Sequence, residues 1–294
     1  MRVLVTGANG FVGRNVLERL SSELEFVTLD TDGDVDVRHD LNSPLTWMPE
    51  TPIDAILHLA AESGVRTFTQ DGFENNVTST ANILDWAIAA NVKMVVYSSS
   101  SSVYGNSMLM EETASMQPLS PYAQSKFACE RLVTSWAKRQ NRIAVTFRLF
   151  NAIGKHQRAG MFPSLICEHL VNIKDGAGGE LPLFGSRLRS WTYIGDIVNG
   201  FWSALTTFYG GKLGTNLLIN LGTNAMLNQR DLIQLFSERA GIVPNLVMAE
   251  PNPMDVQRTK ADMARFIALF GWQPDHRNVI VGVEELLRQY GLLG

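Results

Sequence analysis

The segment VLVTGANGFVG, residues 3–13, decides the fold. Its start, Val3–Thr6, is typical of a buried strand, and the glycines that follow predict a tight turn opening a helix. Gly7 permits the turn, Gly10 lets backbone approach a pyrophosphate, and Gly13 lets the helix lie close on the strand. A turn without a ligand is the alternative, but strand, turn and helix occur here in the required order. The residues expected at a pyrophosphate site are Gly7, Asn9, Gly10, Phe11, Val12 and Gly13.

The first half of the chain continues this pattern, because short apolar runs alternate with amphipathic segments. Helical patterns cover Asn76–Ala90 and Pro121–Lys138. Such alternation indicates βαβ units, so we predict an α/β protein with a Rossmann-type, doubly wound parallel sheet covered on both faces. The expected strands are Val3–Thr6, Phe26–Leu29, Ile53–Leu59, Met94–Tyr97 and Ile143–Phe150.

The second half has a different pattern and predicts a smaller C-terminal α/β substrate-binding lobe. A glycine-rich loop, Gly176–Gly179, precedes a strand-like Asn216–Leu221. We expect the dinucleotide-binding domain to comprise residues 1–151 and about 190–222, and the lobe about 152–189 and 223–294. Helical patterns in the lobe cover Arg230–Ala240, Ala261–Phe270 and Val279–Tyr290.

Acidic residues follow the second expected strand and favour NAD over NADP. Asp30 ends that strand, where a carboxylate accepts hydrogen bonds from the adenosine ribose. The next four residues, 31–34, include no basic side chain, so we expect a 2′-phosphate to be repelled. Asp30 could instead be a turn acid. Asp40 and Leu41 are expected near the adenine.

The composition excludes several functional classes. The 294 residues carry a net charge of -4 and no basic stripe, which argues against nucleic-acid binding. No apolar run has the length of a membrane span, and the N-terminus does not resemble a signal peptide. Two cysteines are too few for a disulfide framework, so we expect a cytoplasmic protein, and we expect no bound metal.

Candidate catalytic side chains come from two further segments. In Tyr122-Ala-Gln-Ser-Lys126, Tyr and Lys are four apart and share one helix face. A nearby ammonium favours the phenolate, although such pairs also occur by chance. In Ser98–Ser102, five serines follow a buried-strand pattern, so they are expected at the carboxyl end of a strand, where open sheets bind ligands. One serine hydroxyl could there align a substrate hydroxyl with the phenolate.

These motifs together resemble the extended short-chain dehydrogenase/reductase family, NAD-dependent epimerase/dehydratase branch, over essentially the whole chain. The resemblance extends beyond TGANGFVG and YAQSK to His58-Leu-Ala-Ala61, Asn76-Val-Thr-Ser-Thr80, Phe147-Arg-Leu-Phe-Asn-Ala-Ile-Gly154 and Phe270-Gly-Trp-Gln-Pro274.

The resemblance implies a role for each matching residue. Ser100 matches the catalytic serine, Tyr122 the acid/base, and Lys126 the lysine that binds the nicotinamide ribose and tunes the phenol. Asn151 and Arg189 match residues that bind a substrate diphosphate, and Phe184 a residue that packs on the nucleobase. A surface ion pair for Arg189 and a core position for Phe184 are the alternatives. Further expected cofactor contacts are Leu59, Ala60, Ala61, Asn76 and Ser98, and Ser101 is a further expected substrate contact.

One departure from the family concerns a second diphosphate arginine. Relatives often carry it in an RxGD-like stretch, which here is Asn252-Pro-Met-Asp255. Arg258, a few residues later, is the expected replacement; Arg187 could also take part, or could point into solvent.

The serine segment also bears on the reaction. Dehydratases of this family carry an acid pair there, whereas Ser100-Ser-Ser102 has no carboxylate, so dehydration is disfavoured. The resemblance implies 4-epimerisation of a nucleoside-diphosphate sugar, above all a UDP-sugar, through a transient 4-keto intermediate, and a homodimer formed through Asn76–Ala90 and Pro121–Lys138.

Three other functions stay open. An NAD(P)H-dependent reductase of a nucleoside-diphosphate 4-keto-(6-deoxy) sugar would use the same residues in one direction. A non-catalytic dinucleotide-binding regulatory paralogue would be expected to have a broken Ser-Tyr-Lys set, which is intact here. A steroid-type dehydrogenase would have little use for Arg189.

Overall fold

The computed structural model describes residues 1–63, 69–185, 187–211, 215–250 and 256–294. Its centre is a seven-stranded sheet of order β11-β6-β5-β4-β1-β2-β3, in which every neighbouring pair is parallel. The predicted doubly wound Rossmann fold is therefore confirmed. The strands are β1 (Arg2–Thr6), β2 (Glu25–Asp30), β3 (Val37–Arg38), β4 (Ala55–His58), β5 (Met94–Ser100), β6 (Ile143–Leu149) and β11 (Asn216–Leu221).

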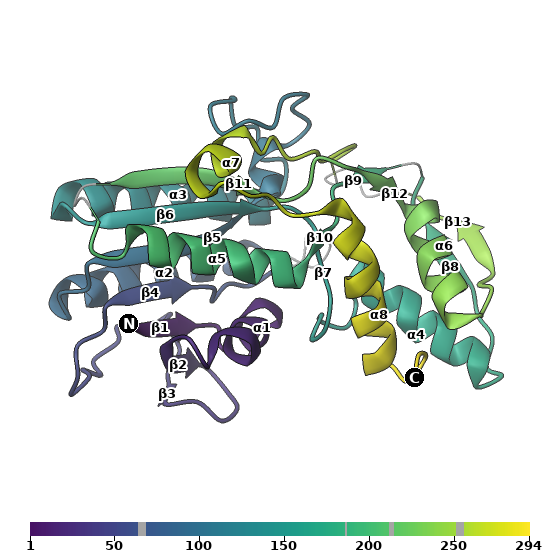
Figure 1. Ribbon diagram of the computed structural model, residues 1–294, viewed down its shortest axis with the longest axis horizontal. Coiled ribbons are helices and arrows are strands. Elements are labelled where there is room, and N and C mark those ends of the chain that lie inside the picture. The colour runs from purple at the N-terminus through teal and green to yellow at the C-terminus, as the bar shows by residue number, and fades with distance from the viewer. Residues whose placement is uncertain (64–68, 186, 212–214, 251–255) are drawn as a thin grey trace.

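Helices cover both faces of this sheet (Figure 1). One face carries α1 (Phe11–Leu20), α5 (Ile194–Phe208) and α7 (Ala264–Phe270), and the other α2 (Gln70–Ala89) and α3 (Pro121–Gln140). The central strands are consequently buried on both sides, which explains their continuous apolar sequences. Helix α2 begins six residues before the predicted Asn76 because Thr69 caps it, with its hydroxyl accepting from Gly72 N–H.

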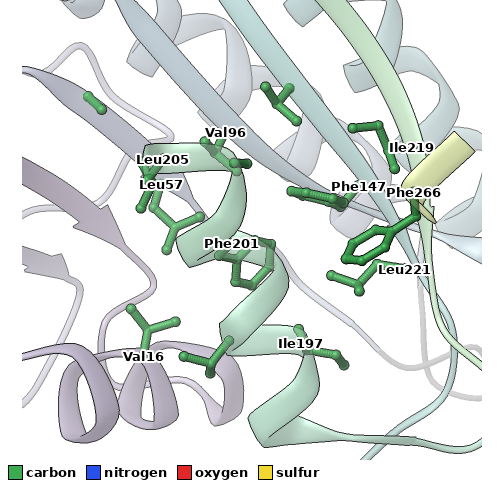
Figure 2. Close-up of a cluster of buried hydrophobic side chains, with 14 of the residues drawn as sticks. Val16, Leu57, Val96, Phe147, Ile197, Phe201, Leu205, Ile219, Leu221 and Phe266 are labelled. Carbon is green, nitrogen blue, oxygen red and sulfur yellow. The ribbon is translucent and has the colours of Figure 1, made fainter. Parts of the chain in front are cut away.

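The core beneath α5 shows why this helix docks where it does (Figure 2). Ile197, Phe201 and Leu205 line one side of α5 at helical spacing and are fully buried. The ring of Phe201 meets that of Phe147 edge-on, with centroids 5.6 Å apart. Leu221 of β11 is buried in the same cluster.

The second lobe lies beyond the carboxyl edge of the sheet (Figure 1). Its helices are α4 (Phe162–Lys174), α6 (Gln229–Ala240) and α8 (Val279–Gln289), which share a separate apolar core. Its short strands pair as β13 (Leu246–Met248) with β8 (Leu181–Leu183), and β12 (Leu227–Asn228) with β9 (Leu188–Arg189); β10 (Thr192–Tyr193) pairs with β7 (Ala152–Ile153). In the described residues, two 3-10 turns, η1 (Ser101–Tyr104) and η2 (His276–Asn278), complete the elements.

Helix α7 departs from the expected division into two parts. The sequence places residues 223–294 in the lobe, yet Phe266 of α7 is fully buried in the core of the sheet. Its ring packs against Phe147 and against Trp272, with centroids 6.4 and 5.0 Å away. The chain therefore returns to the sheet before it ends in the lobe.

Within the described ranges, we find no helix that is both long and apolar enough to span a membrane.

Truncation of Leu221 should test the packing beneath α5. We expect Leu221→Ala to lower the free energy of unfolding by about 2–5 kcal/mol, because it leaves a cavity among fully buried side chains. The matched variant Leu109→Ala removes the same atoms from a side chain that is 67% exposed, and should change it by less than about 0.5 kcal/mol. Urea denaturation of both variants measures the difference, and equal midpoints would contradict this view of the core.

Candidate active site

The predicted phosphate loop joins β1 to α1 as expected. A side chain at Gly13 would overlap the carbonyl oxygen of Gly7 and lie 2.6 Å from that of Ala8, so only glycine permits this approach. The N-cap residue of α1, Gly10, provides no side-chain cap, so the first N–H groups of the helix, at Phe11 and Val12 among them, are not capped by a side chain. These features fit the pyrophosphate of a dinucleotide.

Thr6, which the sequence analysis did not single out, joins the predicted loop after β4 to this glycine turn. The backbone N–H groups of Leu59 and Ala60 both donate to Thr6 Oγ1, at 3.2 Å. A Cβ on Gly7 would lie 2.7 Å from Ala60 N, so the two loops are in contact. Ala61 follows and is exposed. The threonine was detectable as the last strand residue before the glycines.

Asp30 lies beside the glycine turn and is tied to it. Its Oδ2 accepts from Asn9 N–H at 2.8 Å and its Oδ1 from Thr31 N–H at 2.7 Å. Asp40 is exposed and accepts from Asn42 N–H at 2.9 Å, while Leu41 is buried. Asp30 thus adjoins the glycine turn, and contacts of Asp30, Asp40 and Leu41 with an adenosine stay predictions.

The expectation that no basic residue lies near this end needs a correction. Parallel pairing of β2 with β3 sets Arg38 opposite Asp30, and the Arg38 guanidinium donates to the Gly33 carbonyl at 2.7 Å. The sequence analysis considered only residues 31–34 and missed this arginine, which returns to the site in the next strand.

The catalytic candidates meet at the end of β5. Lys126 Nζ donates to the carbonyl of Ser98 at 2.8 Å. Tyr122 and Ser100 are hydrogen-bonded through their hydroxyls. Ser100 Oγ also accepts from Ser102 N–H at 3.2 Å and from Ser102 Oγ at 2.9 Å. Because these two bonds use Ser100 as an acceptor, its own proton is available to Tyr122.

Burial has the largest effect on the pKa values of Tyr122 and Lys126. It raises the pKa of Tyr122, while the hydrogen bond from Ser100 lowers it. Burial also lowers the pKa of Lys126 to about 8, against the opposing effect of Cys129 and Glu130. The ammonium form of Lys126 therefore still dominates at neutral pH, and the phenol of Tyr122 stays protonated until a further positive charge approaches.

The other serines of the run have different partners. Ser99 is buried and donates to Glu130 Oε1 at 2.6 Å, so its hydroxyl is engaged away from Tyr122. Ser101 is 5% exposed in η1. Ser102, not singled out from the sequence, supplies both donors to Ser100.

Asn76 holds loops together rather than facing an open site. Its Oδ1 accepts from Glu62 N–H at 2.7 Å, and its Nδ2 donates to Ser125 Oγ at 3.0 Å. Through these bonds Asn76, which is 2% exposed, links the loop after β4 to α2 and α3. A direct cofactor contact of Asn76 stays a prediction.

His58, at the end of β4, is neutral and lies between Thr6 and the segment of α2 that carries Asn76. Its Nδ1 lies 2.7 Å from Thr6 Oγ1, and its Nε2 lies 3.2 Å from Thr80 Oγ1. The Thr80 hydroxyl donates to Asn76 O, so His58 Nε2 must be the donor to Thr80. Burial, and then the charge of Lys126, lower the pKa of His58 to about 3.

Three of the predicted substrate residues lie on adjoining segments. Thr259 N–H donates to the carbonyl of Leu188, and Thr259 Oγ1 donates to Asn151 Oδ1 at 3.5 Å. A β-bridge also joins Leu188 to Arg258. Asn151 is thereby brought to the strand that carries Arg189.

The two predicted arginines are both tied to backbone. Arg189 is 8% exposed and donates to the carbonyls of Val256, at 2.7 Å, and Leu188, at 2.9 Å. Arg258 donates to the carbonyl of Met108 at 3.3 Å. Phe184 follows β8 in a different small sheet and is half-buried. Asn252–Asp255 lie outside the described residues.

A loop after η1 borders this region. Gly105, with φ +59°, begins it, and any Cβ there would overlap the carbonyl oxygen of Gln117. The loop returns when Gln117 N–H donates to the carbonyl of Val103. Its carbonyl at Met110 accepts from Asn220 Nδ2 at 2.7 Å, which holds it beside β11.

Comparison with known proteins agrees with this geometry. Residues 3–222 match the model of the NAD dependent epimerase/dehydratase family. A UDP-glucose 4-epimerase of Azospirillum brasilense is 26% identical over 313 residues, which cover 94% of this chain and 88% of that protein. A UDP-glucose 4-epimerase of Lactobacillus helveticus is 26% identical over 315 residues, covering 95% and 94%.

Solved structures are also similar. MoeE5 in complex with UDP-glucuronic acid and NAD superposes with a TM-score of 0.87 at 28% identity, covering 98% of this chain and 99% of that one. The crystal structure of a UDP-galactose 4-epimerase gives a TM-score of 0.84 at 25% identity, with the same coverage.

The contact at Gly13 predicts a selective loss of dinucleotide binding. Gly13→Ala must push α1 away from the carbonyls of Gly7 and Ala8, so we expect NAD affinity to fall at least about tenfold. Helix propensity alone would make the variant about 1 kcal/mol more stable. Calorimetric titration with NAD, together with thermal unfolding, measures both, and parental affinity would show that the close approach is dispensable.

Proposed function

Because the chain belongs to the NAD-dependent epimerase/dehydratase family, we propose that it is an NAD-dependent epimerase that inverts C4 of a UDP-sugar through a transient 4-keto sugar. The observation that carries the proposal is the Ser100–Tyr122 hydrogen bond, set beside the glycine turn at the carboxyl edge of the sheet. Curated relatives named UDP-glucose 4-epimerase, matched over nearly their whole length, support the choice of reaction.

The chain's own residues fit the cofactor. The α1 start would hold the pyrophosphate, Asp30 the adenosine ribose, and Lys126 the nicotinamide ribose. NAD, when bound, supplies a hydride acceptor that returns the hydride, and its cationic ring favours the phenolate of Tyr122.

Tyr122 and Ser100 would move the proton. As phenolate, Tyr122 takes the proton of the C4 hydroxyl and later returns it, and Ser100 holds that hydroxyl in line. Burial raises the pKa of Tyr122, so the free protein keeps the phenol protonated and only the loaded site forms the base. Lys126 contributes its ammonium charge from one helical turn away.

The substrate diphosphate would be held on the lobe side. The carbonyls of Leu188 and Val256 orient the guanidinium of Arg189, whose planar shape suits phosphate oxygens, and Asn151 lies on the adjoining segment through Thr259. Since the sugar must turn over between hydride removal and return, the diphosphate has to be the fixed point. Arg189 and Asn151 are therefore assigned to binding, Phe184 to packing on the nucleobase, and Arg258 to a further phosphate contact.

Oligomeric state and location follow the same proposal. We infer a homodimer formed through α2 and α3, which pack against each other on one face of the sheet and carry the exposed Ile88. Cys129 and Cys167 are both free and buried thiols, which suits a cytoplasmic protein.

The defining experiment identifies any dinucleotide that copurifies with the protein, then incubates the protein with UDP-sugars. An epimerase interconverts a 4-epimer pair without net consumption of cofactor. Stoichiometric consumption of added NADH by a 4-keto nucleotide sugar would instead identify a reductase. No turnover in either assay would refute both.

Replacement of the phenol should separate chemistry from binding. Tyr122→Phe removes the acid/base hydroxyl, so we expect turnover to fall by about 10³-fold or more while NAD affinity changes little. Tyr209→Phe makes the same change at a tyrosine that is 49% exposed and should keep parental turnover. Steady-state kinetics and NAD titration check the pair; activity surviving in Tyr122→Phe would disprove the assignment.

Arg189→Lys should affect substrate binding more than chemistry. Lysine keeps the charge but loses the planar fork, so we expect KM for the UDP-sugar to rise about tenfold with a smaller change in kcat. Arg288→Lys on α8, 52% exposed in its side chain, is the control. A fall in kcat alone would contradict a purely binding role.

A further inference from the structure

A regular stripe on α3 faces the serine run. Tyr122, Lys126 and Glu130 follow one another at intervals of four residues, so they lie on one side of the helix. Each contacts a different serine of β5: Tyr122 meets the Ser100 hydroxyl, Lys126 the Ser98 carbonyl, and Glu130 the Ser99 hydroxyl. Two of these residues belong to the proposed catalytic set. The third, Glu130, has no assigned role.

Glu130 is buried and accepts three hydrogen bonds. Its Oε1 accepts from Ser99 Oγ at 2.6 Å and from Arg148 Nε at 2.9 Å, and its Oε2 accepts from Arg148 Nη2 at 2.8 Å. The two ion-pair side chains are 5% and 2% exposed. Arg148 comes from β6, the strand next to β5, so the carboxylate joins one helix to two strands.

Further contacts tie Arg148, the ion-pair partner of Glu130, to the neighbouring strands. Arg148 and Ser99 are opposite each other in the β5–β6 register, and the guanidinium also lies over the ring of Tyr104, 4.7 Å from its centroid. Tyr104 in turn donates to Asn220 Oδ1 at 2.7 Å, on β11. The next residue after Ser99 is Ser100, so a carboxylate that fixes Ser99 also fixes the backbone from which the Tyr122 partner projects.

We propose that Glu130 is a positioning residue of the proposed epimerase reaction: through Ser99 it locks the end of β5 against α3, so that the Ser100 hydroxyl meets Tyr122. The inference rests on the proposed function for its kinetic consequence, but not for its structural one. Without the lock, Ser100 loses its alignment and the phenolate loses a hydrogen bond.

The hydrogen bond from Ser100 sets the sign of the effect on the pKa of Tyr122, among the following titratable neighbours. Around Tyr122 lie Lys126 and Cys129 on α3 and Tyr97 on β5; His58 on β4 stays neutral. The hydrogen bond from Ser100 lowers the pKa of Tyr122, so its loss raises that pKa. Proton removal from the sugar needs the phenolate, so the rise of kcat with pH should move to higher pH.

Ser99→Ala is the cleanest test, because it removes the bond to Glu130 and leaves the Arg148–Glu130 pair intact. We expect kcat to fall about tenfold with KM within about twofold, and the rise of kcat to shift to higher pH. Ser164→Ala removes an equally buried serine hydroxyl, one that donates to the Gln157 carbonyl in the lobe. It should keep the parental kcat and pH profile.

Glu130→Gln completes a double-mutant cycle with Ser99→Ala. If Glu130 acts through Ser99, the double variant should shift the pH profile no further than the larger single effect. Ser99→Ala stands alone if Glu130→Gln does not fold.

Tyrosinate absorbance supplies a readout that needs no turnover. The titration of each NAD-loaded protein, minus that of the same protein with Tyr122→Phe, isolates Tyr122. We expect the midpoint to move to higher pH in Ser99→Ala and to stay unchanged in Ser164→Ala. An unchanged midpoint in Ser99→Ala would overturn the positioning role. If the parent protein turns over no UDP-sugar but the Tyr122 midpoint still moves in Ser99→Ala, the proposed reaction is refuted and the positioning role of Glu130 is retained.

Discussion

The parallel direction of the seven strands is the constraint on which the rest of the molecule depends. Parallel strands all end at the same edge, so each delivers its last residues to one line. Thr6 is paired with His58, and Ser100 with Leu149, so strands far apart in the chain stop at a common level. The glycine turn, the loop after β4 and the serine run consequently adjoin one another, on the side of the sheet where the lobe lies.

Much of this arrangement could be predicted from the sequence, because the decisive features are local. The strand, turn and helix around Gly7 and Gly13 are specified by contiguous residues, and the spacing of Tyr122 and Lys126 needs only a helix. The serine run could not be resolved, because strand alternation does not say which serine meets which residue of α3. That depends on how the helix docks, and the same holds for Arg38, which the pairing of β2 with β3 sets opposite Asp30. Phe266 shows a third kind of limit, since an apolar helix pattern does not say which of two cores receives it.

The buried pair of Arg148 and Glu130 is an expensive way to hold a strand. Two charges taken from water cost several kcal/mol each, and their attraction roughly repays this only in good geometry. The Arg148 Nη1 atom is buried without a hydrogen-bond partner, so the attraction between the two charges does not fully offset the free energy of removing them from water. An apolar pair would serve stability as well, but it would not accept the hydrogen bond that the Ser99 hydroxyl donates. The Glu130 carboxylate is therefore better explained by the position in which it holds the end of β5 through Ser99 than by the stability that it adds.

The contact between the loop ends at Gly105 and Gln117 separates loop residues whose side chains can vary from those that are fixed. Residues 106–116 lie between two fixed points. One is Gly105, where any side chain would strike the carbonyl of Gln117, and the other is Gln117, whose N–H donates to the carbonyl of Val103. Drift in sequence can alter the outward side chains Met108 and Leu109, which are 68% and 67% exposed, without moving the ends of the loop. Selection can thus remodel the border of the proposed substrate site in small, viable steps, while the strand that carries the proposed catalytic serine is inherited unchanged.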